Sequence, residues 1–366
     1  MTGNSNFDSG YTRTTYVRDD PYTSPGSNEW GPSYRVSGNI NPDLKWEEKK
    51  EFNVGVDFGF LGNRINGKFD WFFRNVDDML FSVTASIPPL TRRTMLKNVG
   101  SLRNHGWEFE ITGRIFQTET FDWSSTLRFS SNISKITNLG AEDSQIVSAG
   151  LPQGMGNTHK LINNQQIGKF WLFRTAGVDE SGRWLIYDRG GNVVPADGND
   201  KIENKCYVGN GVPKLIFSMN HDFRYRGFDL GIACHSYIDY DVYDTVNLYY
   251  GLQSQTGINV LHSAYRENSH IKDNRILCDY FLSDASFFKI DAVSLGYTLD
   301  LSKWQNYVKN LRFYLTARDV ATFTAFKGYN PDPGITGLFP GVIRVRDKVT
   351  MHPQTIHWTL GMQVRF

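Results

Sequence analysis

Long apolar segments are missing from the sequence. No stretch of the 366 residues approaches the roughly 18 uninterrupted apolar residues that a membrane-spanning helix requires. An excess of charge of one sign is missing as well, since the net charge is +1 at pH 7. These absences exclude a helical membrane protein, and they argue against a nucleic-acid partner, which would call for a basic surface.

Cysteine is scarce: the chain has 3, Cys206, Cys234 and Cys278, an odd number at irregular spacing. This set predicts neither a closed disulfide framework nor a zinc site. Cys234 falls in line with the apolar residues Leu230 and Ile232. We therefore interpret the cysteines as small apolar side chains.

The first residues lack the basic start and the apolar core of an export signal. Two explanations are open, a signal encoded upstream or a cytosolic protein. The strand pattern described next favours the upstream signal.

Aromatic residues and glycine are plentiful, at 14% of the chain and 34 residues respectively. The segment 356–366 places an apolar side chain at every even position and a polar or small one between, which gives a strand with one apolar and one polar face. Outer-membrane barrels conceal their hydrophobicity in this way, because only alternate residues meet lipid, and they often end on a terminal Phe such as Phe366.

The same alternation recurs in four hairpins before the last strand, which predicts about nine antiparallel strands. The apolar positions of the hairpins are Phe52, Val54, Val56, Phe58 and Phe60 with Ile65, Phe69, Trp71 and Phe73; Trp107, Phe109, Ile111 and Ile115 with Phe121, Trp123, Leu127, Phe129 and Ile133; Leu215, Phe217, Met219 and Phe223 with Phe228, Leu230, Ile232 and Cys234; and Val293, Leu295, Tyr297 and Leu299 with Leu311, Phe313, Leu315 and Ala317.

Connections within the hairpins are short, whereas those between hairpins are long and polar. Because outer-membrane barrels have short periplasmic turns and long outer loops, this difference orients the strands. We expect an outer loop at 1–48, two barrel hairpins at 49–135, an extracellular insert at 136–212, and further barrel strands at 213–366. The insert contains two short candidate strands, Lys169 to Arg174 and Arg183 to Tyr187, which we do not expect to cross the membrane.

Nine strands do not make a barrel of the usual even number. We therefore expect this all-β chain to supply the C-terminal portion of a transmembrane antiparallel barrel, with the rest in the same or a second polypeptide. An open strand edge in hydrocarbon would leave backbone N–H and C=O groups without partners.

Four segments, in this order, resemble SusC/RagA-like TonB-dependent transporters. They are Asn41-Pro-Asp-Leu-Lys-Trp-Glu47, Asn98-Val-Gly-Ser-Leu-Arg-Asn-His-Gly-Trp-Glu-Phe-Glu110, Asp284-Ala-Ser-Phe-Phe-Lys-Ile-Asp-Ala-Val-Ser-Leu-Gly-Tyr-Thr-Leu299 and Lys327-Gly-Tyr-Asn-Pro-Asp-Pro-Gly334.

The resemblance implies a 22-stranded barrel in the outer membrane of a Gram-negative bacterium, closed by a plug and driven by TonB. It also implies a SusD-like surface lipoprotein as partner, and oligosaccharides or oligopeptides as imported substrates. The family often has an acidic Asn-Gly-Asp-Gly loop where this chain reads Asp197-Gly-Asn-Asp-Lys-Ile202, so the resemblance does not carry an ion site to this loop.

The aromatic residues fall into two groups. On the apolar faces, and at the rim, we expect membrane-interface aromatics: Trp71, Trp107, Trp123, Trp358 and Phe366. In the outer segments, rings are available to stack on sugars or peptide side chains: Trp171, Trp184, Tyr237, Tyr240, Tyr243, Tyr249 and Tyr250. Loop packing and contact with the lipoprotein are the alternatives for this second group.

Catalytic patterns are weak. The pairs Glu47 with Glu48 and Glu108 with Glu110 are conceivable glycosidase carboxylates, but Glu108 and Glu110 lie on the polar face of a strand, where wetting of a barrel interior explains them. The 8 histidines are scattered, and no glycine-rich loop precedes a helix. The acidic residues Asp188, Asp197, Asp200 and Glu203 fit a solvated loop better than a cation site. We expect no enzyme activity, cofactor or metal.

Two functions of different classes remain: the barrel part of an energised importer, and a secreted β-rich glycan-binding module. A sandwich would press its apolar faces together and would not need bulky aromatics beside polar neighbours on nearly every strand. The importer is therefore favoured.

Overall fold

The computed structural model describes residues 16–18, 34–36, 39–84, 90, 94–139, 144–147, 151, 155–254, 257–301, 307–335, 337–343 and 354–366. Most of the expected outer loop at 1–48 lies outside these residues. Its described part contains β1 (Tyr16–Arg18) and β2 (Tyr34–Val36), which pair with each other.

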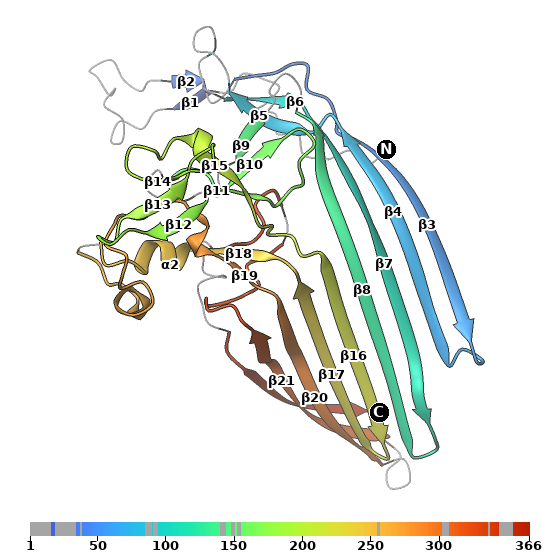
Figure 1. The fold of residues 1–366 in the computed structure, drawn as a ribbon. Helices are drawn as coiled ribbons and strands as arrows, with labels where there is room; N and C mark the ends of the chain where they lie inside the picture. The colour runs from blue at the N-terminus through green and yellow to red at the C-terminus, as the bar shows by residue number, and fades with distance from the viewer. Residues whose placement is uncertain are drawn as a thin grey trace.

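Nine long strands form one continuous antiparallel sheet in the order β23-β21-β20-β17-β16-β8-β7-β4-β3 (Figure 1). Their bounds are β3 (Glu48–Phe60), β4 (Ile65–Asp77), β7 (Ser101–Gln117), β8 (Phe121–Asn138), β16 (Leu215–Tyr225), β17 (Phe228–Ile238), β20 (Phe287–Asp300), β21 (Asn310–Thr324) and β23 (His357–Arg365). The number of strands and their pairing confirm the prediction of four hairpins and a last strand.

The turns between β3 and β4, between β7 and β8, and between β16 and β17 lie at the same end of the sheet (Figure 1). The turn between β3 and β4 takes positive φ at Leu61, Gly62 and Asn63, and the turn between β16 and β17 does so at Arg226. Two-residue and slightly longer hairpin loops need this backbone conformation to match the twist of their strands. At the opposite end the chain enters long connections.

Strand register collects the apolar side chains on one face. Leu360 pairs with Leu315, and Met362 pairs with Phe313. Rings also line up across strands on this face, with Phe129 4.8 Å from Phe217 between ring centroids. Leu360 is 81% exposed, so the face is not the inside of a sandwich. An apolar face left open to the surroundings is what a lipid-facing sheet presents.

Smaller elements gather beyond the other end of the long strands (Figure 1). They are β5 (Leu80–Thr84), β6 (Thr94–Asn98), β9 (Ser144–Val147), β10 (His159–Ile162), β11 (Phe170–Phe173), β12 (Thr175–Val178), β13 (Trp184–Tyr187), β14 (Val193–Pro195), β15 (Lys205–Val208), β18 (Asp241–Asp244), β19 (Leu282–Asp284), β22 (Val342–Ile343), the helix α2 (Thr245–Tyr250), and short 3-10 helices at Ile202–Asn204, His262–Tyr265 and Asp279–Phe281. Two of these strands, β11 and β13, correspond to the two that the sequence predicts in the insert.

The connections share one hydrophobic core rather than forming separate polar loops. Phe170, Trp184 and Ile186 of the insert pack with Leu248 and Phe281 of the 240–285 connection, and all five are buried. We call the described residues of 155–212, 239–285 and 337–343 the cap. The expectation that these connections are merely long and polar is corrected here, because apolar residues scattered along them come together only in the folded cap.

A second buried cluster joins the cap to the sheet. Tyr240 and Val246 of the cap pack with Phe287 at the start of β20 and Phe326 after β21. None of the described strands of 139–212 belongs to the nine-stranded sheet, although residues 164–167 hydrogen-bond through their backbone to the end of β8 at Ser134 and Ile136. The position of this insert outside a membrane stays a prediction. In the described part of the chain, no helix combines the length and hydrophobicity that crossing a membrane would require.

Candidate functional site: the polar wall

Charged and hydroxyl side chains line the face of the nine-stranded sheet opposite the apolar one, and we call this face the polar wall. Arg74 pairs with Glu51 on the neighbouring strand, with 2.8 Å between Nε and Oε1. Further along, Arg128 of β8 donates to Glu110 of β7 at 2.5 Å. Carboxylates and cations therefore meet between adjacent strands, and Glu110 belongs to an ion pair rather than to a pair of catalytic acids.

One ion pair spans three strands. Arg312 of β21 donates to both carboxylate oxygens of Asp229 of β17, at 2.9 Å from Nε and 2.5 Å from Nη2. The intervening strand β20 contributes Gly296 beneath the pair, where a Cβ atom would lie 2.5 Å from Arg312 Nη2 and from Asp229 Oδ1. The absence of a side chain at Gly296 is what lets the two charged groups meet.

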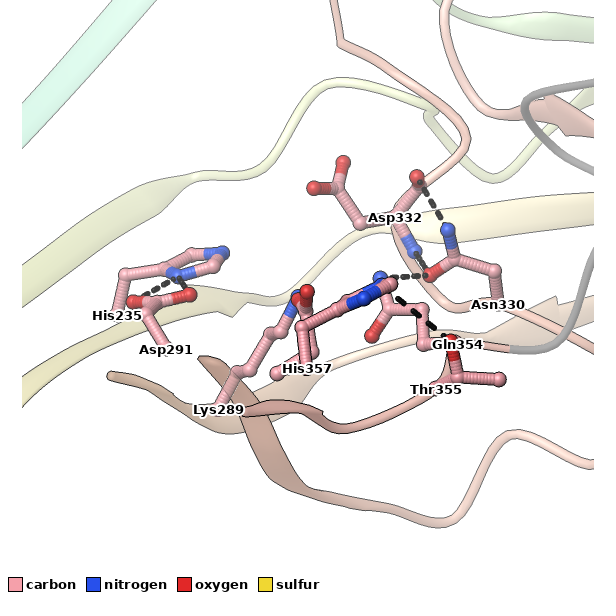
Figure 2. Close-up of polar contacts among 9 residues, drawn as sticks. His235, Lys289, Asp291, Asn330, Asp332, Gln354, Thr355 and His357 are labelled. Carbon is pink, nitrogen blue, oxygen red and sulfur yellow. Dashed lines mark hydrogen bonds and ion pairs between the residues drawn. The ribbon is translucent and has the colours of Figure 1, made fainter. Parts of the chain in front are cut away.

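Near the cap, two more pairs occupy the polar wall. The ring of His235 is hydrogen-bonded through Nδ1 to Asp291 at 2.7 Å (Figure 2). Lys289, which is only 8% exposed, donates to Asp319 at 2.6 Å. The register shifts between Ile290 and Ala292, and Asp319 takes a φ of 55°, so bulges in β20 and β21 turn both carboxylates toward the wall.

The segment before β23 carries neutral polar groups into the same region. Asn330 accepts from the backbone N–H of Asp332 at 3.0 Å, and Thr355 contacts Nε2 of His357 at 3.3 Å (Figure 2). The hydroxyl of Tyr240 donates to the carbonyl of Pro331, which fastens this segment to the cap.

The chemistry of the polar wall suits binding and passage of polar solutes. Its ion pairs set donors and acceptors of both signs side by side along the wall. Among the described residues no hydroxyl or thiol is hydrogen-bonded to His235, so the contact between His235 and Asp291 has no nucleophile beside it. The described part of the chain also holds no cluster of three or more metal-binding side chains, and Asp188 accepts hydrogen bonds from Asn192 within its own turn.

Four of the rings proposed for substrate contact are buried in the cap. Trp184, Tyr240, Tyr243 and Tyr249 are between 0% and 4% exposed, and the indole N–H of Trp184 donates to the carbonyl of Asn274 at 2.8 Å. These four rings pack against other side chains, which was the alternative left open for them, and the structure presents none of their faces to a solute.

The other three rings remain half-buried. Tyr237 lies in β17, not in a loop as expected, and packs against Phe287 with 5.1 Å between ring centroids. Tyr250 packs between the two clusters of the cap. Trp171 lines a cavity of about 380 Å³ in the cap. Substrate contact by these three residues stays a prediction.

The rings expected at the membrane interface all lie on the sheet. Trp358 and Phe366 are 67% and 77% exposed, at the start and just after the end of β23, and Trp123 is near the start of β8. Trp71 and Trp107 pair directly with each other well inside β4 and β7. The role of all five rings at a membrane interface stays a prediction.

Buried carboxylates are a feature of the cap that sequence reasoning missed. Asp244 caps helix α2 by accepting from the N–H groups of Val246 and Asn247 at 2.9 and 3.1 Å, and burial raises its pKa. Asp279 accepts from the N–H of Thr175 at 2.8 Å, and burial raises its pKa as well. The N-cap of α2 was detectable in principle, since Asp is a preferred residue there. The contact between Asp279 and Thr175 joins residues far apart in sequence, and no local pattern indicates it.

Comparisons with known proteins agree with this architecture. The family model for the TonB dependent receptor-like β-barrel matches residues 4–319. The chain is 28% identical over 350 residues to the TonB-dependent receptor SusC of Bacteroides thetaiotaomicron. The matched region covers 89% of this chain and 33% of SusC. It is 25% identical over 315 residues to the TonB-dependent receptor P3 of Formosa agariphila, covering 80% of this chain and 31% of that protein.

Among solved structures, the RagAB peptide transporter superposes with a TM-score of 0.80 at 22% identity, over 99% of this chain and 40% of that chain. The closed-closed state of the RagAB peptide importer gives a TM-score of 0.81 at 21% identity, with coverage of 99% and 40%. This chain thus spans about a third of the length of the curated relatives it matches. The resemblance to SusC/RagA-like proteins is confirmed, and the chain belongs to the TonB-dependent receptor family, whose transmembrane β-barrel its nine-stranded sheet forms in part.

Proposed function

We propose that this chain forms the C-terminal part of the barrel of a SusC-like importer in the outer membrane of a Gram-negative bacterium. The importer takes up oligosaccharides or oligopeptides together with a SusD-like surface lipoprotein. The observation that carries the proposal is the two-faced sheet, with exposed Leu360 on one side and the paired charges of Asp229 and Arg312 on the other. The first face suits lipid and the second a water-filled interior.

The remaining barrel and plug are partners in this proposal. Within the described chain, β3 pairs only with β4, and β23 pairs only with β21. An unpaired backbone N–H or C=O group in hydrocarbon costs several kcal/mol of free energy. Both edge strands therefore need further strands to pair with. Those strands belong to the rest of the transporter, on the same or a separate polypeptide, and its plug part contacts TonB.

The cap lies at the end of the sheet opposite the hairpin turns (Figure 1). In this proposal it faces the outside of the cell, because the long loops of outer-membrane barrels are extracellular. A rigid cap with its own core gives a lipoprotein lid a fixed surface to contact. The relative RagAB is described as a peptide transporter. Peptides and glycans are therefore both substrate classes to test.

Cell fractionation and uptake test the proposal. The protein, tagged at its native locus, is expected to stay with outer membranes after carbonate washing, to leave them only in detergent, and to bring a lipoprotein with it. Deletion of the locus should abolish uptake of a labelled oligosaccharide or oligopeptide, and dissipation of the proton motive force should have the same effect. Release of the protein by salt and carbonate would instead support a secreted glycan-binding module.

A further inference from the structure

A cavity of about 380 Å³ opens at the surface of the cap, between β11, β15 and the segment 275–277. Phe173 and Leu277 are buried at its base, whereas Gly156, Asp200 and Ile202 at its rim are exposed. The cavity therefore combines an apolar base with an open mouth, which is the usual form of a small-ligand site.

Lys205 lines this cavity with an ammonium group that lacks a carboxylate partner. It lies opposite Phe173 in the ladder of β11 and β15, and its Nζ is 5.2 Å from the centre of that ring. In the described part of the chain, no carboxylate is within ion-pairing distance of Lys205 Nζ. Burial lowers the pKa of the ammonium to about 8. A half-buried cation without a counter-ion favours an anion beside it.

Trp171 also lines the cavity. Its indole N–H is buried, and no acceptor for it is present among the described residues. Lys160 places its Nζ 4.8 Å from the centre of the Trp171 ring, and Arg275 also lines the cavity. The lining of the cavity thus holds two cations, Lys205 and Arg275, and one carboxylate, Asp200 on the exposed rim.

We propose that this cavity binds a carboxylate-bearing unit of the transported oligomer, with Lys205 as its counter-ion and the Trp171 N–H as a further donor. The proposal rests on the proposed importer function and names the chemistry of part of the substrate. Charge-assisted hydrogen bonds from an ammonium are stronger than neutral ones. A neutral unit would leave the ammonium unpaired, so the cavity should discriminate against it. A uronic acid of a glycan and an acidic residue of a peptide carry the same group.

Binding to the detergent-solubilised transporter complex tests the proposal by calorimetry. The probes are a uronic-acid disaccharide with its neutral counterpart, and an N-acetylated tripeptide ending in Glu with its neutral amide counterpart. We expect one acidic probe to bind about tenfold more tightly than its neutral counterpart, since a hydrogen bond to a charged group contributes roughly this much. The probe series that responds identifies the source of the carboxylate.

Variants assign the effect to Lys205. Lys205→Gln should abolish the preference for the acidic probe, Lys205→Arg should keep it, and Lys201→Gln, an exposed charge on the same segment, should leave it unchanged. Raising the pH from 7 to 9.5 should weaken the preference of the wild type as Lys205 loses its proton, but not that of Lys205→Arg, because arginine keeps its charge. The probe carboxylates stay ionised across this range.

The proposal is overturned if the wild type binds neither acidic probe, if it binds acidic and neutral probes equally, or if Lys205→Gln keeps the preference. Retained folding of each variant is checked by the protease resistance of the cap. Fractionation decides the importer function separately. A protein that binds the acidic probe but leaves the membrane in carbonate would retain this site and refute the transporter.

Discussion

Asp229 and Arg312 are joined by two hydrogen bonds across the full width of strand β20, directly above Gly296. The pair thus couples β17, β20 and β21 on the polar wall. Its geometry depends on a position that carries no side chain, so a conservative change at Gly296 should act on a contact between two other residues.

Gly296→Ala is expected to destabilise the barrel relative to Gly231→Ala, a matched change on β17. An added Cβ at Gly296 lies 2.5 Å from both charged groups, whereas a Cβ at Gly231 would lie 3.8 Å from Asp222 Oδ1, an ordinary van der Waals contact. The expected difference is about 1 kcal/mol, the value of a partly exposed ion pair. Thermal unfolding followed by gel mobility measures it. The effect of Gly296→Ala should disappear in an Arg312→Gln background, and an undiminished effect there would contradict this explanation.

Leu360→Arg should impair membrane assembly far more than Thr359→Arg. Leu360 is 81% exposed on the apolar face, while its neighbour Thr359 pairs with Thr316 on the polar wall. Arginine facing lipid near the midplane costs about 2 to 4 kcal/mol, and arginine facing the interior costs little. Denaturant unfolding in lipid vesicles gives both values. An equal loss of unfolding free energy in the two variants would mean that both residues have similar surroundings, which would contradict the assignment of Leu360 to the lipid-facing side.

The nine strands were predictable because lipid imposes an apolar residue at every second position, which leaves a local period in the sequence. The pairing of Leu360 with Leu315 follows from that period and the short hairpins. The contact of Lys289 with Asp319 does not, because the bulge between Ile290 and Ala292 shifts the register by a residue that no periodicity reveals.

The cap was less predictable for a different reason. Trp184 donates its backbone N–H to Asp273 at 3.1 Å and its indole N–H to Asn274, about 90 positions along the chain. Short strands around Trp184 were visible in the sequence, but its partners in the 240–285 connection were not. The sequence alone therefore does not distinguish an aromatic residue that contacts a ligand from one that packs in the core of the cap.

Trp184→Ala should open the cap while leaving the barrel folded. Removing a fully buried Trp costs about 3 to 5 kcal/mol, and here it also leaves the carbonyl of Asn274 without its donor. Limited proteolysis should cut the cap of this variant quickly while the protease-resistant barrel fragment persists. Val193→Ala, on the exposed strand β14, is the control and should behave as wild type. A Trp184→Ala cap as resistant as the control would mean that the shared core does not hold the cap together.

Asp244→Asn should flatten the dependence of cap stability on pH. Burial raises the pKa of Asp244 above its ordinary value of 3.8, so the folded cap binds a proton more readily than the unfolded chain. The contribution of this group to stability is therefore fully present below about pH 4 and is lost as the pH rises through the folded pKa. Asparagine is also a good N-cap and can accept from Val246 and Asn247 without titrating.

Protease resistance of the cap, measured between pH 4 and 7.5, compares the two proteins. The wild type should lose more resistance than Asp244→Asn as the pH rises. Asp241 and Asp279 have pKa values raised by burial and act in the same direction, whereas hydrogen bonds lower the pKa of Asp179 and of Asp188, which act in the opposite direction. The difference between the two curves, rather than either curve alone, isolates Asp244. Asp197→Asn, at an exposed carboxylate, is the matched control. Parallel curves for wild type and Asp244→Asn would show that the charge of Asp244 is solvated in the folded cap.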